Sequence, residues 1–157
     1  MYREDVIKVV EKYYKTIISD FSVINAKAMV KSKKFSFKKK NFSEDVENFK
    51  YLKGKLAKFS KVTVLIEKEK GNDILVEETM QLLDTNMAHI YDVIEDSIDY
   101  FDCMDRIRRK EEISFKDNRV KLQKLHSDME EFRKVLGDLD LSYQKILPEE
   151  EQQNPEE

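Results

Sequence analysis

Arg119 and His126 are the two residues whose types and spacing could support catalysis. A histidine can transfer a proton near neutral pH, and an arginine can stabilise charge that develops on a phosphate. His126 follows Arg119 by seven positions, which is close to two helical turns, so both would lie on one face of a helix. The pair is therefore compatible with acid–base chemistry on a phosphate ester.

The pattern R-x6-H, with the polar Asn118 beside the arginine, resembles the short motif of the HEPN family. These are small all-α nucleases whose motif places an arginine before a histidine. The resemblance covers this motif alone. It implies that His126 would handle the proton of an RNA 2′-hydroxyl and that Arg119 would stabilise the phosphate. A HEPN-like ribonuclease is thus one alternative function.

No set of metal ligands accompanies this pair. A di-iron bundle requires a Glu three residues before a His on facing helices. Here Asn86 precedes His89, and Gln123 precedes His126, so neither position supplies a carboxylate. The three glycines also stand apart and form no phosphate-binding loop. We expect no metal and no cofactor, and a non-enzymatic function is favoured.

The charges of the chain are strongly segregated. Residues 1–70 carry 18 basic and 9 acidic side chains, a net charge of +9, whereas residues 71–157 carry 11 basic and 23 acidic ones, a net charge of −12. Residues 21–43 contain seven lysines and no acid, and residues 71–105 contain ten acids and no Lys or Arg. In an up-and-down bundle, much of both segments falls near one end.

These two segments supply the candidate partner-binding residues. In residues 27–42, lysines alternate with phenylalanines, a pattern that suits nucleic acid because lysine neutralises phosphates and aromatic rings stack on bases. Anionic lipid headgroups would suit it equally. The acids could offset the lysines within the molecule, pair with a second copy, or face an external partner. The predicted residues are Lys31, Lys33, Lys34, Phe35, Phe37, Lys38, Lys39, Lys40, Asp92, Glu95, Asp96, Asp99 and Asp102.

Long helices must position these residues. Apolar residues recur at alternating steps of three and four in four segments, which predicts an all-α, antiparallel bundle of about four long helices with coiled-coil-like heptad seams. The seams are Ile7, Val10, Tyr14, Ile17, Phe21, Ile24 and Ala28; Phe49, Leu52, Leu56, Phe59, Thr63 and Ile66; Met80, Leu83, Met87, Ile90, Ile94, Ser97, Phe101 and Met104; and Phe115, Asn118, Leu122, Leu125, Met129, Phe132, Leu136 and Leu139.

Polar residues and glycine mark the helix ends. Ser114 and Asp73 are typical N-caps, Asn41 or Ser43 could cap the second helix, and Gly71 favours a helix stop. The predicted helices span residues 3–34, 44–70, 73–111 and 115–141. The third would exceed its neighbours in length, so it is expected to bend, to overhang its neighbours or to pack against a second chain. The β-prone stretch 62–76 leaves a β-hairpin as an alternative.

Residues 1–147 are expected to form one domain, and residues 148–157 a disordered acidic tail. The single Cys103 favours a reducing compartment, and no apolar stretch indicates a signal peptide or a transmembrane helix, which together predict a cytoplasmic location. The favoured function is a scaffold, adaptor or inhibitor that binds a protein partner. Homo-oligomerisation and nucleic-acid binding through residues 27–42 remain open beside it.

Overall fold

The computed structural model of the chain consists of helices packed side by side. It describes residues 2–33, 40–69, 71–111 and 113–152. Helices account for 89% of the described residues, and none of these residues forms a strand. The prediction of an all-α fold is therefore confirmed.

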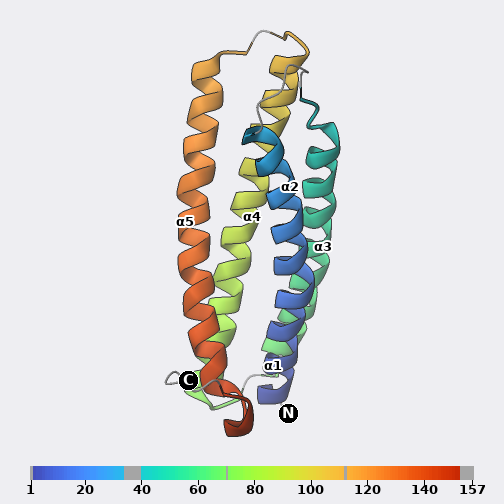
Figure 1. Ribbon diagram of the computed structural model, residues 1–157. Coiled ribbons are helices and arrows are strands. Elements are labelled where there is room, and N and C mark those ends of the chain that lie inside the picture. The colour runs from blue at the N-terminus through green and yellow to red at the C-terminus, as the bar shows by residue number, and fades with distance from the viewer. Residues whose placement is uncertain (1, 34–39, 70, 112, 153–157) are drawn as a thin grey trace.

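Four helical rods run up and down along one common direction (Figure 1). The first rod is interrupted by a π-helical turn, and a 3-10 turn follows the last. α4 packs most extensively against α5 and next against α3, so it is the central helix of the bundle. In chain order the elements are α1 (Tyr2–Lys12), η1 (Tyr13–Ile18), α2 (Ser19–Lys33), α3 (Ser43–Glu67), α4 (Ile74–Arg108), α5 (Phe115–Ile146) and η2 (Glu149–Glu151).

The stretch 62–76 is helical on both sides of a short connection. α3 continues to Glu67, because Thr63 is buried and holds this part of the helix against the core. The Asp73 carboxylate then accepts a hydrogen bond from the Leu75 N–H at 3.0 Å and begins α4. The β-hairpin alternative is wrong, and α3 ends before the predicted residue 70.

α5 begins as predicted but ends later. The Ser114 hydroxyl accepts a hydrogen bond from the Lys116 N–H at 3.1 Å, which caps the helix. The helix continues past the predicted residue 141 to Ile146, because Tyr143 and Ile146 are buried in the core. With 32 residues in α5 against 35 in α4, the two helices nearly match. The expected excess in length is therefore wrong for α5, whereas α4, with 35 residues, is still longer than α3, with 25.

The first rod shifts its buried face at η1. Ile7 and Tyr14, predicted for the seam, are only partly buried, and the residues just before them take the core positions. From Tyr13 the buried positions advance twice by four residues, to Ile17 and then to Phe21. In a regular α-helix two such steps would rotate the buried side chains away from the core, and the wider π turn compensates for this rotation. The buried residues of this seam are Val6, Val10, Tyr13, Ile17, Phe21 and Ala28.

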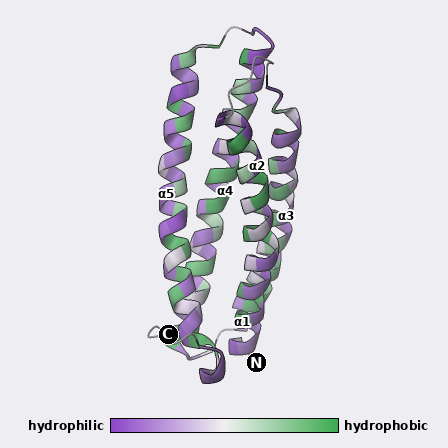
Figure 2. Cartoon of the chain, in the orientation of Figure 1, coloured by the Kyte–Doolittle hydropathy of each residue, from purple (hydrophilic) through white to green (hydrophobic). Residues whose placement is uncertain are grey.

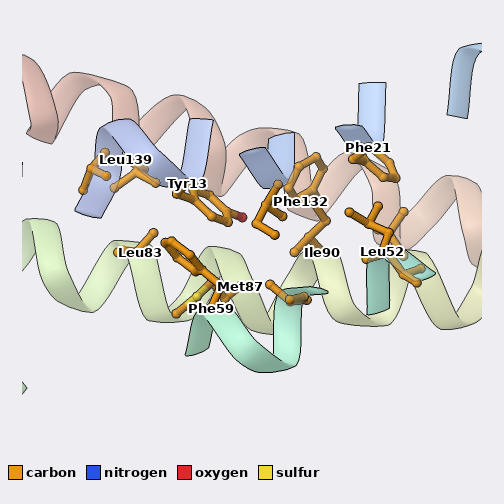
Figure 3. Close-up of a cluster of buried hydrophobic side chains, with 14 of the residues drawn as sticks. Tyr13, Phe21, Leu52, Phe59, Leu83, Met87, Ile90, Phe132 and Leu139 are labelled. Atoms are coloured by element: carbon orange, nitrogen blue, oxygen red, sulfur yellow. The ribbon is translucent and has the colours of Figure 1, made fainter. Parts of the chain in front are cut away.

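The seams predicted for α3 and α4 lie in the core almost throughout. Figure 3 shows Leu52, Phe59, Leu83, Met87 and Ile90 packed together with side chains of the first rod and of α5. Hydropathy follows this arrangement, with many hydrophilic residues along the outer sides of the helices (Figure 2). The seam of α5 differs, because its first residue, Phe115, is 78% exposed, its first buried residue is Leu125, and Leu136 is only partly buried.

A buried polar network joins three of the rods within this apolar core. The Tyr13 hydroxyl donates a hydrogen bond to Asn86 Oδ1 at 2.5 Å. Asn86 Nδ2 in turn donates to the Phe132 carbonyl of α5 at 3.1 Å. Tyr13 and Asn86 are both fully buried, and each provides the hydrogen-bond partner that the other's buried polar group needs. The network thus fixes how η1, α4 and α5 are aligned.

The end of the chain adds one short element. In the predicted acidic tail, η2 forms a single 3-10 turn, and Gln152 Nε2 donates a hydrogen bond to the Leu147 carbonyl at 2.9 Å. The remaining tail residues, 153–157, lie outside the described part of the chain. No helix among the described residues combines the length and apolar character that crossing a membrane requires.

Candidate functional site

Arg119 and His126, the proposed catalytic pair, both lie on the outer surface of α5. Both side chains are exposed, and neither forms a hydrogen bond or ion pair with another residue that the structure describes. Neither lines the hollows discussed below. The helix thus places the pair on one open face, without the enclosed surroundings that general acid–base catalysis usually employs.

The acids of α4 are largely matched by lysines of the neighbouring helices. Glu95 forms an ion pair with Lys53 of α3. On the other side, Lys124 and Lys121 of α5 lie 2.5 Å and 3.8 Å from carboxylate oxygens of Asp96 and Asp99. Asp92 and Asp102 are exposed and have no partner among the described residues. The compensation comes from lysines outside the acid-free segment.

Asp96 is the buried member of this group. Its side chain is 7% exposed and faces both Lys124 and the carboxyl group of Asp128. Burial raises the pKa of Asp96 to about 6, and a hydrogen bond with Asp128 adds to the effect while Lys124 opposes it. The two carboxyl groups and Lys124 link α4 to α5.

The lysine-rich segment is only partly described. Lys31 lies 2.5 Å from the buried carboxylate of Asp45 and is thus engaged within the molecule. Lys40 donates a hydrogen bond to the Ser32 carbonyl at 3.0 Å, whereas Lys33 is exposed and unpaired among the described residues. The other predicted members, Lys34, Phe35, Phe37, Lys38 and Lys39, lie outside the described residues.

Asp105 of α4 closes this end of the bundle, a role that the sequence reading did not assign. Its carboxylate accepts hydrogen bonds from the Phe42 N–H and the Ser43 hydroxyl, both at 3.1 Å. Arg108 Nε donates to it at 3.0 Å. Burial raises the pKa of Asp105, but these hydrogen bonds outweigh burial and lower it overall. The sequence signal was an acid that ends a base-free segment just before three arginines.

A second group of lysines, which the sequence reading also missed, forms a basic face on the first rod and α3. Its members are all exposed, and their ammonium groups have no acidic partner among the described residues. Their spacing of three and four residues along each helix could have revealed them. The basic face consists of Lys8, Lys12, Lys15, Lys58 and Lys61.

A groove of about 200 Å³ lies at the centre of the basic face, between η1 and α3. Ile17 and Phe59 are buried beneath it, and the Phe59 ring lies 5.7 Å from that of Tyr13. Val62, 37% exposed, completes an apolar floor. The rim is polar, and it consists of Lys12, Thr16, Lys55 and Lys58.

Lys55 differs from the other lysines at this groove, because Asp20 holds its ammonium group at 2.5 Å. Lys12 and Lys58 are therefore the rim lysines that have no acidic partner among the described residues. Their positive charges stand beside apolar surface that remains open to solvent. The groove thus combines two features of binding sites: a concave apolar floor and a few charged groups at its edge.

A hollow of about 330 Å³ lies between α3 and α4 on another side, lined by Leu56, Ala57, Ser60, Asp84, Met87, Ala88 and Tyr91. Burial raises the pKa of Asp84 to about 7, and a hydrogen bond with Glu67 and the negative charges of Glu67 and Glu77 add to this.

No group of three or more possible ligands among the described residues is arranged to hold a metal ion.

The comparisons with known proteins add no assignment. No family model, no curated protein and no solved structure matches this chain. The basic face and its groove are accordingly defined by geometry and charge alone.

Proposed function

We propose that the protein is a non-enzymatic helical interaction protein that binds an acidic partner protein through the basic face. The observation that carries this proposal is the set of unpaired lysines around an apolar groove, Lys12 and Lys58 above all. By contrast, Lys53, Lys121 and Lys124 form ion pairs with acids of α4. Unmatched charge beside open apolar surface is what an interface supplies.

A protein suits this face better than a nucleic acid does. The aromatic rings near the groove are buried, Phe59 among them, so they present no flat surface on which an unpaired base could stack. The groove instead offers aliphatic and aromatic edges to an apolar side chain. The free, buried Cys103 is consistent with a reducing compartment, so we place the protein and its partner in the cytoplasm.

Affinity capture from the native cell tests this function. The wild-type protein is compared with Lys12→Glu/Lys58→Glu and with the control Lys134→Glu, which reverses an exposed lysine on α5. We expect the wild type and the control to retain the same protein, and the double variant to lose at least nine tenths of it. Two reversed charges can weaken association by about tenfold or more.

Two results would contradict the proposal. Equal capture by the double variant would show that the basic face is not used. Loss of the captured protein after digestion with nuclease would show that nucleic acid bridges the two and would favour that alternative. Circular dichroism of each variant confirms that the helices are retained, which we expect because every replaced side chain is exposed.

A further inference from the structure

The size of the groove restricts what it can hold. Sites for cofactors and drug-sized molecules usually enclose about 300–1,000 Å³. The groove between η1 and α3 measures about 200 Å³ and is open to solvent along the surface. It therefore matches one bulky apolar side chain better than a whole small molecule. Protein interfaces commonly centre on such an anchor in a pocket.

The rim restricts what must surround this anchor. Lys12 and Lys58 stand on opposite walls, one from the end of α1 and one from α3, and both lack an acidic partner among the described residues. Lys8 and Lys15 lie about one turn on either side of Lys12, and Lys61 lies about one turn beyond Lys58. Two rows of positive charge thus flank the apolar floor. Residues three or four apart on a partner helix would reach both rows.

We propose that the groove receives one bulky apolar side chain of an acidic amphipathic helix in the partner, with the carboxylates of that helix on Lys12 and Lys58. This inference rests on the proposed function and specifies the partner's chemistry at the same face. The anchor fills the space over Ile17, Phe59 and Val62 and covers the exposed part of the Val62 side chain.

Two occupants from this chain itself fit less well. The acidic residues 149–157 include no aliphatic or aromatic side chain other than proline, so they supply no anchor. A second copy that brought the acids of its α4 would also bring Lys53 and Lys124, which pair with those acids. Those lysines would approach the lysines of the groove and repel them.

Fluorescence anisotropy with a designed peptide tests the proposal directly. The probe is a labelled helical peptide with one central Leu and a Glu three and four residues to either side. We expect saturable binding to the full chain below about 1 mM. Replacing the central Leu of the peptide by Ala weakens binding at least tenfold, because it removes most of the apolar surface that the anchor buries.

Variants of the protein separate the groove from the charge around it. Val62→Trp fills the groove and leaves every lysine in place, and we expect it to weaken binding at least tenfold. Lys12→Glu/Lys58→Glu should do the same, whereas Lys134→Glu should bind normally. In methyl NMR spectra the peptide should shift the signals of Ile17 and Val62 and leave those of Val23, an exposed residue of α2, unchanged.

Each outcome decides something. No saturable binding, equal binding of the Ala peptide, or unshifted Ile17 and Val62 signals overturns the proposal. Weakening by charge reversal but not by Val62→Trp would leave the basic face as an interface and reject the groove as its anchor site. Insensitivity to both variants would reject the inference, and the affinity capture described above would then decide the proposed function independently.

Discussion

Asp105 of α4 accepts a hydrogen bond from the backbone N–H of Phe42, 63 residues earlier in the chain, at 3.1 Å. The start of α3 is thus held by a carboxylate from another helix, in addition to Asn41, whose side chain accepts a hydrogen bond from the Ser43 N–H at 2.9 Å. A helix N-terminus favours negative charge, and here that charge comes from the end of the neighbouring helix. This contact closes the bundle where the α2–α3 connection returns.

We expect Asp105→Ala to destabilise the fold by about 2–4 kcal/mol. The substitution removes the acceptor for the buried Phe42 N–H and leaves Arg108 without this carboxylate. Asp105→Asn keeps one acceptor and should lose about half as much. Urea unfolding followed by circular dichroism measures both. Equal stability of Asp105→Ala and the wild type would show that the contact contributes nothing.

Asn86→Ala should lower the free energy of unfolding by about 3–4 kcal/mol. It leaves the buried Tyr13 hydroxyl without its acceptor, removes the hydrogen bond that Asn86 donates to the Phe132 carbonyl, and also opens a cavity. A double-mutant cycle with Tyr13→Phe isolates the contact between the two side chains. We expect a coupling energy of about 1 kcal/mol or more. Strict additivity would contradict the network.

Lys110 should be replaceable by glycine with a gain in stability. It has a φ of 61° at the end of α4, where its N–H donates to the Ile107 carbonyl and the Glu111 N–H donates to the Arg106 carbonyl. A left-handed residue with a side chain costs about 1–2 kcal/mol, part of which the greater freedom of unfolded glycine offsets. Lys110→Gly should therefore stabilise by about 0.5–1 kcal/mol in thermal unfolding. Lys110→Ala, which keeps the strain, is the matched control.

The helices and most of the core were predictable because their signals are local and repeated. The steps of three and four through Leu52, Leu83 and Ile90 predict a buried face whatever the neighbouring helix is. The π turn was not predictable, because the regular seam through Ile7 and Tyr14 fits the sequence as well as the observed one. In the observed register Tyr13 is buried and pairs with Asn86, a contact with another helix that the local pattern does not reveal.

The candidate site was harder to predict than the fold. From the sequence, the site was expected in the two largest blocks of like charge. In the structure, however, acids of α4 such as Asp96 form ion pairs with lysines of the adjacent helices, and Lys31 forms one with Asp45. Whether a charge is matched depends on pairs far apart in sequence, such as Lys124 and Asp96. Lys12 and Lys58 belong to no conspicuous block, and their shared groove exists only once η1 lies against α3.

The carboxyl group of Asp84 makes the stability of the bundle depend on pH. Its pKa is raised from 3.8 to about 7, chiefly by burial, with Glu67 and Glu77 adding to the effect. The folded state therefore binds a proton that the unfolded state has released between about pH 4 and pH 7. Across this window, stability should fall as the pH rises. Above pH 7 the full penalty of holding the charged group is present.

Asp84→Asn should remove this dependence and stabilise the protein at pH 8. We expect a gain on the order of 2 kcal/mol, less than the full shift implies because the half-buried group is partly screened by solvent. Below pH 4 the variant and the wild type should be equally stable. Urea unfolding at several pH values measures the slope. A parallel slope for the variant and the wild type would show that another group is responsible for the pH dependence. Asp96 is such a group, because its pKa is raised to about 6, and Asp96→Asn measures its share.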